Sequence, residues 1–228
     1  MSKATALLVG LKQVDPNYYD GWDGTDGCSG CEKDVDNIGQ ILNPLGYKIR
    51  TLKTKQATAE NILAGLDDAA RQLQNGDIFV FYFSGHGGQQ PDVNGDEPDG
   101  QDETLVAYNR EVLDDELNRI WRKMRSGVRI VMISDSCNSG SNFRFSGKFS
   151  APTPFLPIAD KDTKWIQAQM IHIGGCRDGF ASMGGRDGGA MTIALCNVWS
   201  GGSFNGTYTD FYNGICRSVT SSQKPQYN

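Results

Sequence analysis

The 228-residue chain lacks long hydrophobic runs. None of its apolar stretches approaches the roughly 20 residues that a membrane-spanning helix needs. Its first residues, Met-Ser-Lys-Ala, lead straight into a short strand-like run and not into the apolar core of a secretion signal. We therefore expect a cytoplasmic protein that does not associate with membranes.

The chain also lacks the basic footprint of a nucleic-acid-binding protein. Its net charge is −5 and its pI is near 5.0. A protein that neutralises phosphates needs a dense positive patch, so no nucleic-acid partner is expected. The largest group of basic residues is a scattered set of four: Arg119, Arg122, Lys123 and Arg125.

Cysteine and histidine are scarce. Six cysteines in a chain of this length are too few for a disulfide scaffold. Cys28 and Cys31 have the spacing of a zinc-ligand pair, but a structural zinc site needs a second pair. The other cysteines stand singly, and His172 is the one histidine besides His86. We expect free thiols and no zinc.

What is present is an alternation of buried strands and amphipathic helices. Apolar runs bounded by turn signals predict strands at residues 5–11, 47–52, 78–83, 128–133 and 167–174. Helical spacing of apolar residues predicts helices at 31–45, 58–73, 113–124, 189–199 and 207–222. Loops are expected at 14–30, 84–102 and 135–164, and a strand or hairpin arm at 103–108. Strands that alternate with helices imply an α/β fold with a parallel sheet.

Two of these strands lead into reactive side chains. His86 follows the strand at 78–83, and Cys137 follows the strand at 128–133. The carboxyl ends of neighbouring parallel strands meet at one edge of a sheet, where α/β proteins place their sites. An imidazole beside a weakly ionised thiol supplies the base that makes the thiol nucleophilic. The pair predicts a cysteine nucleophile, Cys137, with a histidine base, His86.

The surroundings of the pair favour attack on a carbonyl. Backbone N–H groups near Gly87 and Cys137 are the expected donors to a developing oxyanion. Glycines beside His86 let a substrate backbone approach closely. Taken singly, Cys137 is also consistent with a small buried apolar residue, and His86 with a loop histidine held by hydrogen bonds. Their joint placement after two buried strands favours the catalytic interpretation.

The segments around both residues resemble the motifs of a peptidase family. Tyr82-Phe-Ser-Gly-His-Gly and Asp135-Ser-Cys-Asn-Ser-Gly are similar to the histidine and cysteine motifs of metacaspases, the caspase-like cysteine peptidases found outside animals, and of their bacterial relatives. One departure is Asn138, where many metacaspases carry histidine. Further segments that resemble the family lie at 18–34, 96–103, 113–117, 175–178 and 189–192.

The resemblance implies the caspase-like fold, a three-layer α/β sandwich with a mostly parallel central sheet and helices on both faces. Residues 1–228 would form one caspase-like peptidase domain. Within it, 1–140 would carry the catalytic histidine and cysteine, 141–164 a loop, and 165–228 a smaller C-terminal portion. Metacaspases are expected to be monomers, and the sequence shows no apolar edge strand that argues otherwise.

The activity implied is cleavage of peptide bonds after arginine or lysine. Asp34, Ser84 and Asp135 match the family positions that bind the basic side chain. A buried guanidinium or ammonium group needs a counter-charge, which agrees with a pocket lined by carboxylates. From the residues alone, Asp34 is also consistent with a charge at a helix N-terminus, and Asp135 with a hydrogen-bonding group at a strand end. No third residue that orients His86 is evident, so a Cys–His dyad is expected.

Acidic residues raise the question of a calcium site. Residues 92–103 have part of the spacing of an EF-hand, but Glu97 stands where the turn glycine is required, so an EF-hand is excluded. The resemblance instead implies that Asp102, Asp114 and Asp115 bind one Ca²⁺ through carboxylate oxygens. A solvated acidic loop without calcium is the alternative.

The expected loop at 141–164 suggests self-processing. An enzyme specific for basic residues would cut itself in such an exposed loop, although a charged surface loop without cleavage fits equally. The loop carries four basic residues: Arg144, Lys148, Lys161 and Lys164.

Two other functions stay open. A clostripain- or gingipain-like peptidase would share the histidine, the cysteine and the basic specificity without needing the Asp114–Asp115 pair. A non-catalytic caspase-fold scaffold or calcium-binding module would use its loops for partners. Intact His86 and Cys137 favour an enzyme whose partners are peptides or proteins with arginine or lysine at the cleavage site.

Overall fold

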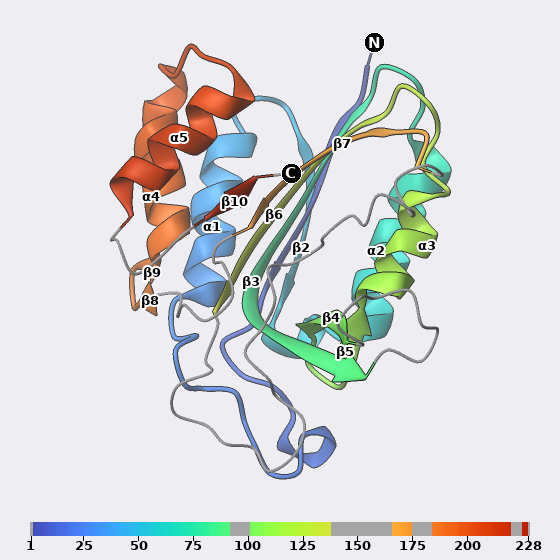
Figure 1. Cartoon of the computed structure of the whole chain (residues 1–228), viewed down its shortest axis with the longest axis vertical. Helices are drawn as coiled ribbons and strands as arrows, with labels where there is room; N and C mark the ends of the chain where they lie inside the picture. Colours follow the sequence, from blue (N-terminus) through green and yellow to red (C-terminus); the bar gives the residue numbers. More distant parts are fainter. Residues whose placement is uncertain (1, 92–100, 138–165, 175–183, 220–224, 228) are drawn as a thin grey trace.

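The computed structural model describes residues 2–91, 101–137, 166–174, 184–219 and 225–227. A central sheet carries helices on both of its faces (Figure 1). The predicted fold, a three-layer α/β sandwich with a mostly parallel sheet, is confirmed.

Six strands form the main path of the sheet, in the order β10–β7–β6–β3–β1–β2. The strands from β7 to β2 are parallel to their neighbours, whereas β10 is antiparallel to β7. The inner strands are covered on both faces, which accounts for their continuous apolar runs. The bounds are Ala4–Gly10 (β1), Lys48–Lys53 (β2), Ile78–Pro91 (β3), Arg129–Cys137 (β6), Gln169–Gly174 (β7) and Gln226–Tyr227 (β10).

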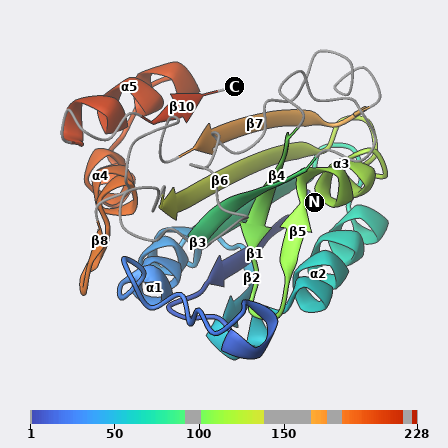
Figure 2. The ribbon, with the colours of Figure 1, turned by 60° about the horizontal axis from the view of Figure 1, so that its bottom comes forward.

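Helices α1, α4 and α5 cover one face of the sheet, and α2 and α3 cover the other (Figures 1 and 2). None of the helices in the described ranges has the length and apolar character needed to cross a membrane. The helices are Cys31–Leu42 (α1), Ala59–Gln72 (α2), Asp114–Trp121 (α3), Ala190–Trp199 (α4) and Tyr208–Ser218 (α5), with short 3-10 turns at Pro16–Tyr18, Thr54–Gln56 and Ser200–Gly202.

Strand β3 supplies side chains to both apolar cores. Phe81 and Phe83 belong to the core under α2 and α3. Val80 and Tyr82 belong to the core under α1, α4 and α5. Successive side chains of a strand point to opposite faces, so the alternation along β3 divides its residues between the two layers.

The structure corrects the loop expected at 84–102. Strand β3 continues to Pro91, because residues 87–91 leave β6 and pair with the antiparallel strand β4, Gln101–Val106. Strand β4 in turn pairs with β5, Glu111–Leu113. Strand β6 likewise includes residues 135–137, which were expected to begin a loop. Backbone groups make these pairings, so polar, glycine-rich residues gave no apolar signal for them.

A small hairpin precedes α4 and was not predicted. It consists of β8, Gly184–Gly185, and β9, Gly188–Gly189. The hairpin packs on the start of α1: a Cβ atom on Gly30 would lie 2.2 Å from the carbonyl oxygen of Gly185. A Cβ atom on Gly188 would lie 2.3 Å from Oδ1 of Asp34, and Gly188 has a φ of +129°. Glycine is required there because other residues would displace the hairpin from α1.

The long connection between β1 and α1 is fastened to the turn before β5. The hydroxyl of Tyr19 donates to the carbonyl oxygen of Ala107 at 2.6 Å. The N–H of Asp15 donates to the carbonyl oxygen of Tyr108 at 2.8 Å. A connection of this length is therefore held at its midpoint by hydrogen bonds to the β4–β5 turn.

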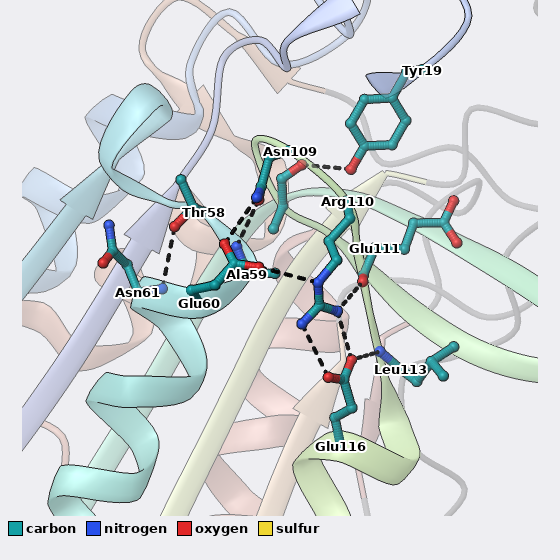
Figure 3. A network of polar contacts seen from close by, with 11 residues as sticks. Tyr19, Thr58, Ala59, Glu60, Asn61, Asn109, Arg110, Glu111, Leu113 and Glu116 are labelled. Atoms are coloured by element: carbon teal, nitrogen blue, oxygen red, sulfur yellow. Dashed lines mark hydrogen bonds and ion pairs between the residues drawn. The ribbon is translucent and has the colours of Figure 1, made fainter. Parts of the chain in front are cut away.

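That turn is itself held by Arg110, which lies between Glu60 of α2 and Glu116 of α3 (Figure 3). Two guanidinium nitrogens of Arg110 reach the carboxylate of Glu116, at 2.8 and 3.1 Å. The amide of Asn109 donates to Glu60 at 2.8 Å and accepts from the N–H of Ala59 at 3.0 Å. The network links α2, α3 and the β4–β5 turn, and so supports the connection that runs from β1 to α1.

Candidate active site

His86 and Cys137 occupy paired positions on neighbouring parallel strands. The register of β3 with β6 pairs Ser84 with Asp135 and His86 with Cys137. Because residues two apart on a strand, and residues paired across parallel strands, share a face of the sheet, Ser84, His86 and Asp135 lie on one face. The two residues that were predicted to meet at a sheet edge are thus brought together by the strand pairing itself.

The imidazole of His86 is held by the connection between β1 and α1. Its Nε2 lies 3.0 Å from the carbonyl oxygen of Gly24. The ring of Trp22 meets it edge on, with the ring centroids 4.9 Å apart. Nδ1 is buried and has no hydrogen-bond partner among the described residues. A carbonyl oxygen accepts hydrogen bonds, so in the neutral ring Nε2 carries the proton and Nδ1 is left as the basic nitrogen.

Burial lowers the pKa of His86 below its usual 6.5, although the hydrogen bond to Gly24 and the charge of Asp26 oppose the shift. The ring is therefore neutral near pH 7. A neutral imidazole with a free nitrogen is the form that accepts a proton from a nucleophile.

The carbonyl of Gly24 is the orienting group that sequence reasoning did not find. It acts through its main chain, so no side-chain motif signals it. Gly24 has a φ of +66°, in the region that favours glycine. The loop around it is closed by a hydrogen bond of 2.8 Å from the N–H of Val14 to the carbonyl oxygen of Asp23.

A pair of buried carboxylates lies next to the His86–Cys137 positions. Asp34 is 1% exposed and Asp135 is 2% exposed. The hydroxyl of Ser84 donates to Oδ2 of Asp34 at 2.8 Å, and the N–H of Gly189 donates to Oδ1 of Asp34 at 2.8 Å. The N–H and hydroxyl of Thr192 donate to Oδ2 of Asp135 at 3.0 and 2.6 Å.

The backbone of Gly189 lies between the two carboxylates. It binds Asp34 through its N–H, and a Cβ atom on it would lie 2.3 Å from Oδ2 of Asp135. The structure therefore brings together Asp34, Ser84 and Asp135, the three residues predicted to bind a basic side chain. They come from α1, β3 and β6, and the start of α4 completes the cluster.

No role for Thr192 or Tyr82 was predicted from the sequence. The hydroxyl of Tyr82 lies 2.6 Å from Oγ1 of Thr192. Since Thr192 uses its own proton toward Asp135, Tyr82 is the donor in this contact. The segment 189–192 was noted for its resemblance to metacaspases, and that was the available signal for Thr192.

The electrostatics of the pair favour a cationic ligand. Burial, together with the negative charge of Asp135, raises the pKa of Asp34 to about 7, and the hydrogen bonds from Ser84 and Gly189 oppose the rise. Both of those donors are neutral. Two like charges held in a buried site are stabilised by an added positive charge, above all by a guanidinium group that donates to both.

The three aspartates expected to bind calcium lie where β4, β5 and α3 meet. Asp102 belongs to β4, and Asp114 starts α3 directly after β5. Both are buried, whereas Asp115 is half-buried. In the described part of the chain, no three or more His, Cys, Asp or Glu residues form a group arranged to hold a metal ion. Calcium binding by these three aspartates stays a prediction.

Some predicted features lie outside the described residues. Asn138 and the loop at 141–164 are among them. The four basic residues considered as self-cleavage positions belong to that loop: Arg144, Lys148, Lys161 and Lys164.

Comparison with known proteins adds an independent finding. Residues 3–228 match the family model described as the caspase domain. Metacaspase-1A of Aspergillus fumigatus is 38% identical over 123 residues, which are 47% of this chain and 30% of that protein. Metacaspase-1A of Aspergillus niger is 36% identical over 154 residues, which are 61% of this chain and 36% of that protein. The chain spans about a third of the length of these curated relatives.

A solved structure is similar along the whole chain. The crystal structure of protein GSU0716 from Geobacter sulfurreducens matches with a TM-score of 0.81 at 33% sequence identity. The match covers 99% of this chain and 92% of that one.

Proposed function

Because the chain belongs to the caspase domain family, we propose that it is a metacaspase-like cysteine endopeptidase that cleaves peptide bonds after arginine or lysine. The observation that carries the proposal is the register of β3 and β6, which aligns His86 with Cys137 and, one step back, Ser84 with Asp135. One pair supplies a base and a nucleophile, and the other contributes to an acidic pocket.

In the proposed reaction, the thiol of Cys137 gives its proton to Nδ1 of His86 and attacks the peptide carbonyl carbon. The oxyanion that forms is stabilised by the backbone N–H groups of Gly87 and Cys137. The imidazolium of His86 then protonates the leaving amine, which breaks the C–N bond and leaves a thioester. A water molecule, deprotonated by His86, hydrolyses the thioester and restores the thiol.

The specificity is proposed to come from Asp34 and Asp135. A guanidinium or ammonium group between them would neutralise two buried like charges, and Ser84 would hold Asp34 in place. A neutral or acidic side chain would leave the charge of the pair uncompensated. Cleavage after aspartate is therefore not expected.

Several finer features complete the proposal. Activation by calcium through Asp102, Asp114 and Asp115, self-processing in the loop at 141–164, a cytoplasmic location and a monomeric state all follow the resemblance to metacaspases. Each of them is independent of the Cys–His chemistry, so the failure of any one leaves the proposed reaction intact.

Active-site labelling tests the function directly. A peptidyl-arginine chloromethyl ketone should alkylate Cys137, and peptide mass spectrometry should find the adduct on that cysteine and not on Cys196 or Cys216. Labelling should slow at least tenfold in Asp135→Asn, because the reagent must first bind through its basic side chain. Equal labelling by a peptidyl-aspartate reagent would contradict the specificity for basic residues. Labelling spread over all cysteines would contradict the assignment of Cys137 as the nucleophile.

A further inference from the structure

A cavity of about 580 Å³ is lined by residues of the sheet and of the helices α1, α4 and α5, which cover the same face of the sheet (Figure 1). Its floor is made by Ile78 and Val80 of β3 and by Val131 and Ile133 of β6. These residues belong to the first halves of the two strands, whereas His86 and Cys137 belong to the second halves. The cavity is thus separate from the candidate active site.

The cavity has the size and character of a site for an apolar small molecule. Most of the side chains around it are aliphatic or aromatic, including Trp199 of α4 and Phe211 of α5. Pockets of 300–1,000 Å³ with apolar walls are typical of small-molecule sites. A polar ligand would lose its hydration there without gaining partners, so the chemistry of the walls selects a hydrocarbon chain or ring.

A positive charge lies next to one end of the cavity floor: Arg129, an exposed residue, is paired on β6 with the lining residue Ile78 of β3. Along β6, Arg129 precedes Val131 and Ile133 on the same face of the strand and therefore continues their row. Its guanidinium Nη2 donates to the carbonyl oxygen of Gly76 at 3.2 Å, and it forms no ion pair within the described residues. Its positive charge is available to an anion.

Two phenol groups line the cavity, and one of them, Tyr47, interacts electrostatically with Arg129. Tyr47 and Tyr208 both line the cavity, and Tyr208 is 46% exposed, so it marks the rim. Burial raises the pKa of Tyr47, and the charge of Arg129 opposes the rise, so the guanidinium lies within electrostatic reach of the phenol. The nearby carboxylate of Asp210 is occupied by hydrogen bonds from Thr207 at the start of α5.

We propose that this cavity binds an apolar carboxylate of the fatty-acid class. The hydrocarbon chain lies on the floor formed by β3 and β6, and the carboxylate binds Arg129, with Tyr47 and Tyr208 as further donors. A guanidinium pairs with a carboxylate through two parallel hydrogen bonds, which fixes the direction of the ligand. The site is independent of the proposed peptidase activity.

Isothermal titration calorimetry with octanoate, decanoate and dodecanoate tests the proposal, at concentrations below those at which the soaps aggregate. The full chain should bind each one saturably at one site, and affinity should rise about fourfold per added CH₂. Dodecanol should bind at least tenfold more weakly than dodecanoate, because it cannot pair with Arg129. Absence of saturable binding by any of the three acids would overturn the proposal.

Variants locate the ligand. Arg129→Gln should weaken dodecanoate binding about tenfold and leave dodecanol binding unchanged. The control Arg125→Gln changes another exposed arginine, which precedes β6 and is not paired with a residue of the cavity floor, and should bind like the parent protein. Val131→Phe should fill part of the cavity above its floor and weaken the binding of both dodecanoate and dodecanol. Circular dichroism checks that this variant is folded. Equal dodecanoate binding by Arg129→Gln and the parent would refute the assigned head-group site even if Val131→Phe failed to fold.

Discussion

His86 on β3 and Cys137 on β6 are paired residues of adjacent parallel strands. Their relative position is fixed by the backbone hydrogen bonds of the sheet, and not by flexible loops. One step back in the same register, Ser84 pairs with Asp135. A site built on strands holds its groups more accurately than one built on loops. The proposed chemistry and the proposed specificity therefore share one rigid scaffold, and each part can be changed separately.

The hydrogen bond from His86 to the carbonyl of Gly24 should affect kcat, because it orients the imidazole. In Gly24→Ala the backbone is strained at its positive φ, and the new Cβ would lie 3.3 Å from Val14. We expect kcat to fall about tenfold with little change in KM, because the imidazole loses its orientation. Steady-state kinetics on an arginine peptide measure both.

Gly21→Ala is the matched control. Gly21 lies in the same connection at a φ of +92°, and a Cβ atom there would meet nothing within 4 Å. The variant has similar backbone strain without a contact to His86. Equal losses of kcat in the two variants would show that general loosening of the loop, and not the Gly24 carbonyl, is responsible.

Thr192 should support the acidic pocket through Asp135. In Thr192→Val, Asp135 keeps the backbone N–H donor of residue 192 but loses the hydroxyl donor, and the buried hydroxyl of Tyr82 loses its acceptor. We expect KM for an arginine substrate to rise several-fold and the free energy of unfolding to fall by about 1–3 kcal/mol. Thr192→Ser keeps the hydroxyl and should restore KM. A Ser variant as impaired as the Val variant would argue against the hydrogen bond as the cause.

The raised pKa of Asp34 should make stability depend on pH. The pKa of Asp34 is raised from 3.8 to about 7 in the folded protein. Because the folded state holds this proton more tightly, the contribution of Asp34 to stability is full below pH 4 and is lost as the pH rises through 7. Asp34→Asn should be more stable than the parent at pH 8, by on the order of 4 kcal/mol, and the gain should shrink toward pH 4.

Urea unfolding between pH 4 and pH 8 measures this difference. Asp187→Asn, at an exposed carboxyl group in the β8–β9 hairpin, serves as the control and should follow the parent curve. If the free energies of unfolding of Asp34→Asn and the parent differed by the same amount at every pH, the buried charge of Asp34 would not contribute to the pH dependence of stability.

Calcium dependence is a separate expectation. If Asp102, Asp114 and Asp115 hold Ca²⁺, EGTA should abolish hydrolysis of an arginine peptide and added CaCl₂ should restore it, while MgCl₂ should not, since Mg²⁺ dehydrates reluctantly and demands a stricter octahedral geometry. Asp114→Asn should raise the calcium concentration needed for half-maximal activity. Full activity of the parent in EGTA would rule out a calcium requirement.

The apolar runs at 78–83 and 128–133 were sufficient to predict the two central strands, but not their full lengths: His86 lies within β3, and Cys137 is the last residue of β6. The pairing of residues 87–91 with β4 was missed because glycines and glutamines form it through backbone groups. Gly24 and Gly189 were missed for a related reason: each acts through its main chain, and only the folded arrangement shows where that main chain lies. Asp34 and Asp135 came from resemblance to a family, since 100 residues lie between them in sequence and no local pattern connects them.

The most direct test of the central claim is hydrolysis of two fluorogenic peptides that differ only in the residue before the cleaved bond, arginine or aspartate. The parent protein, with Ca²⁺ present, should cleave the arginine peptide with a kcat/KM at least a hundredfold higher, because only the cation is matched by Asp34 and Asp135. Cys137→Ala should cleave neither. Undiminished cleavage by Cys137→Ala, or failure of the parent on both peptides, would contradict the assignment of a Cys137–His86 peptidase.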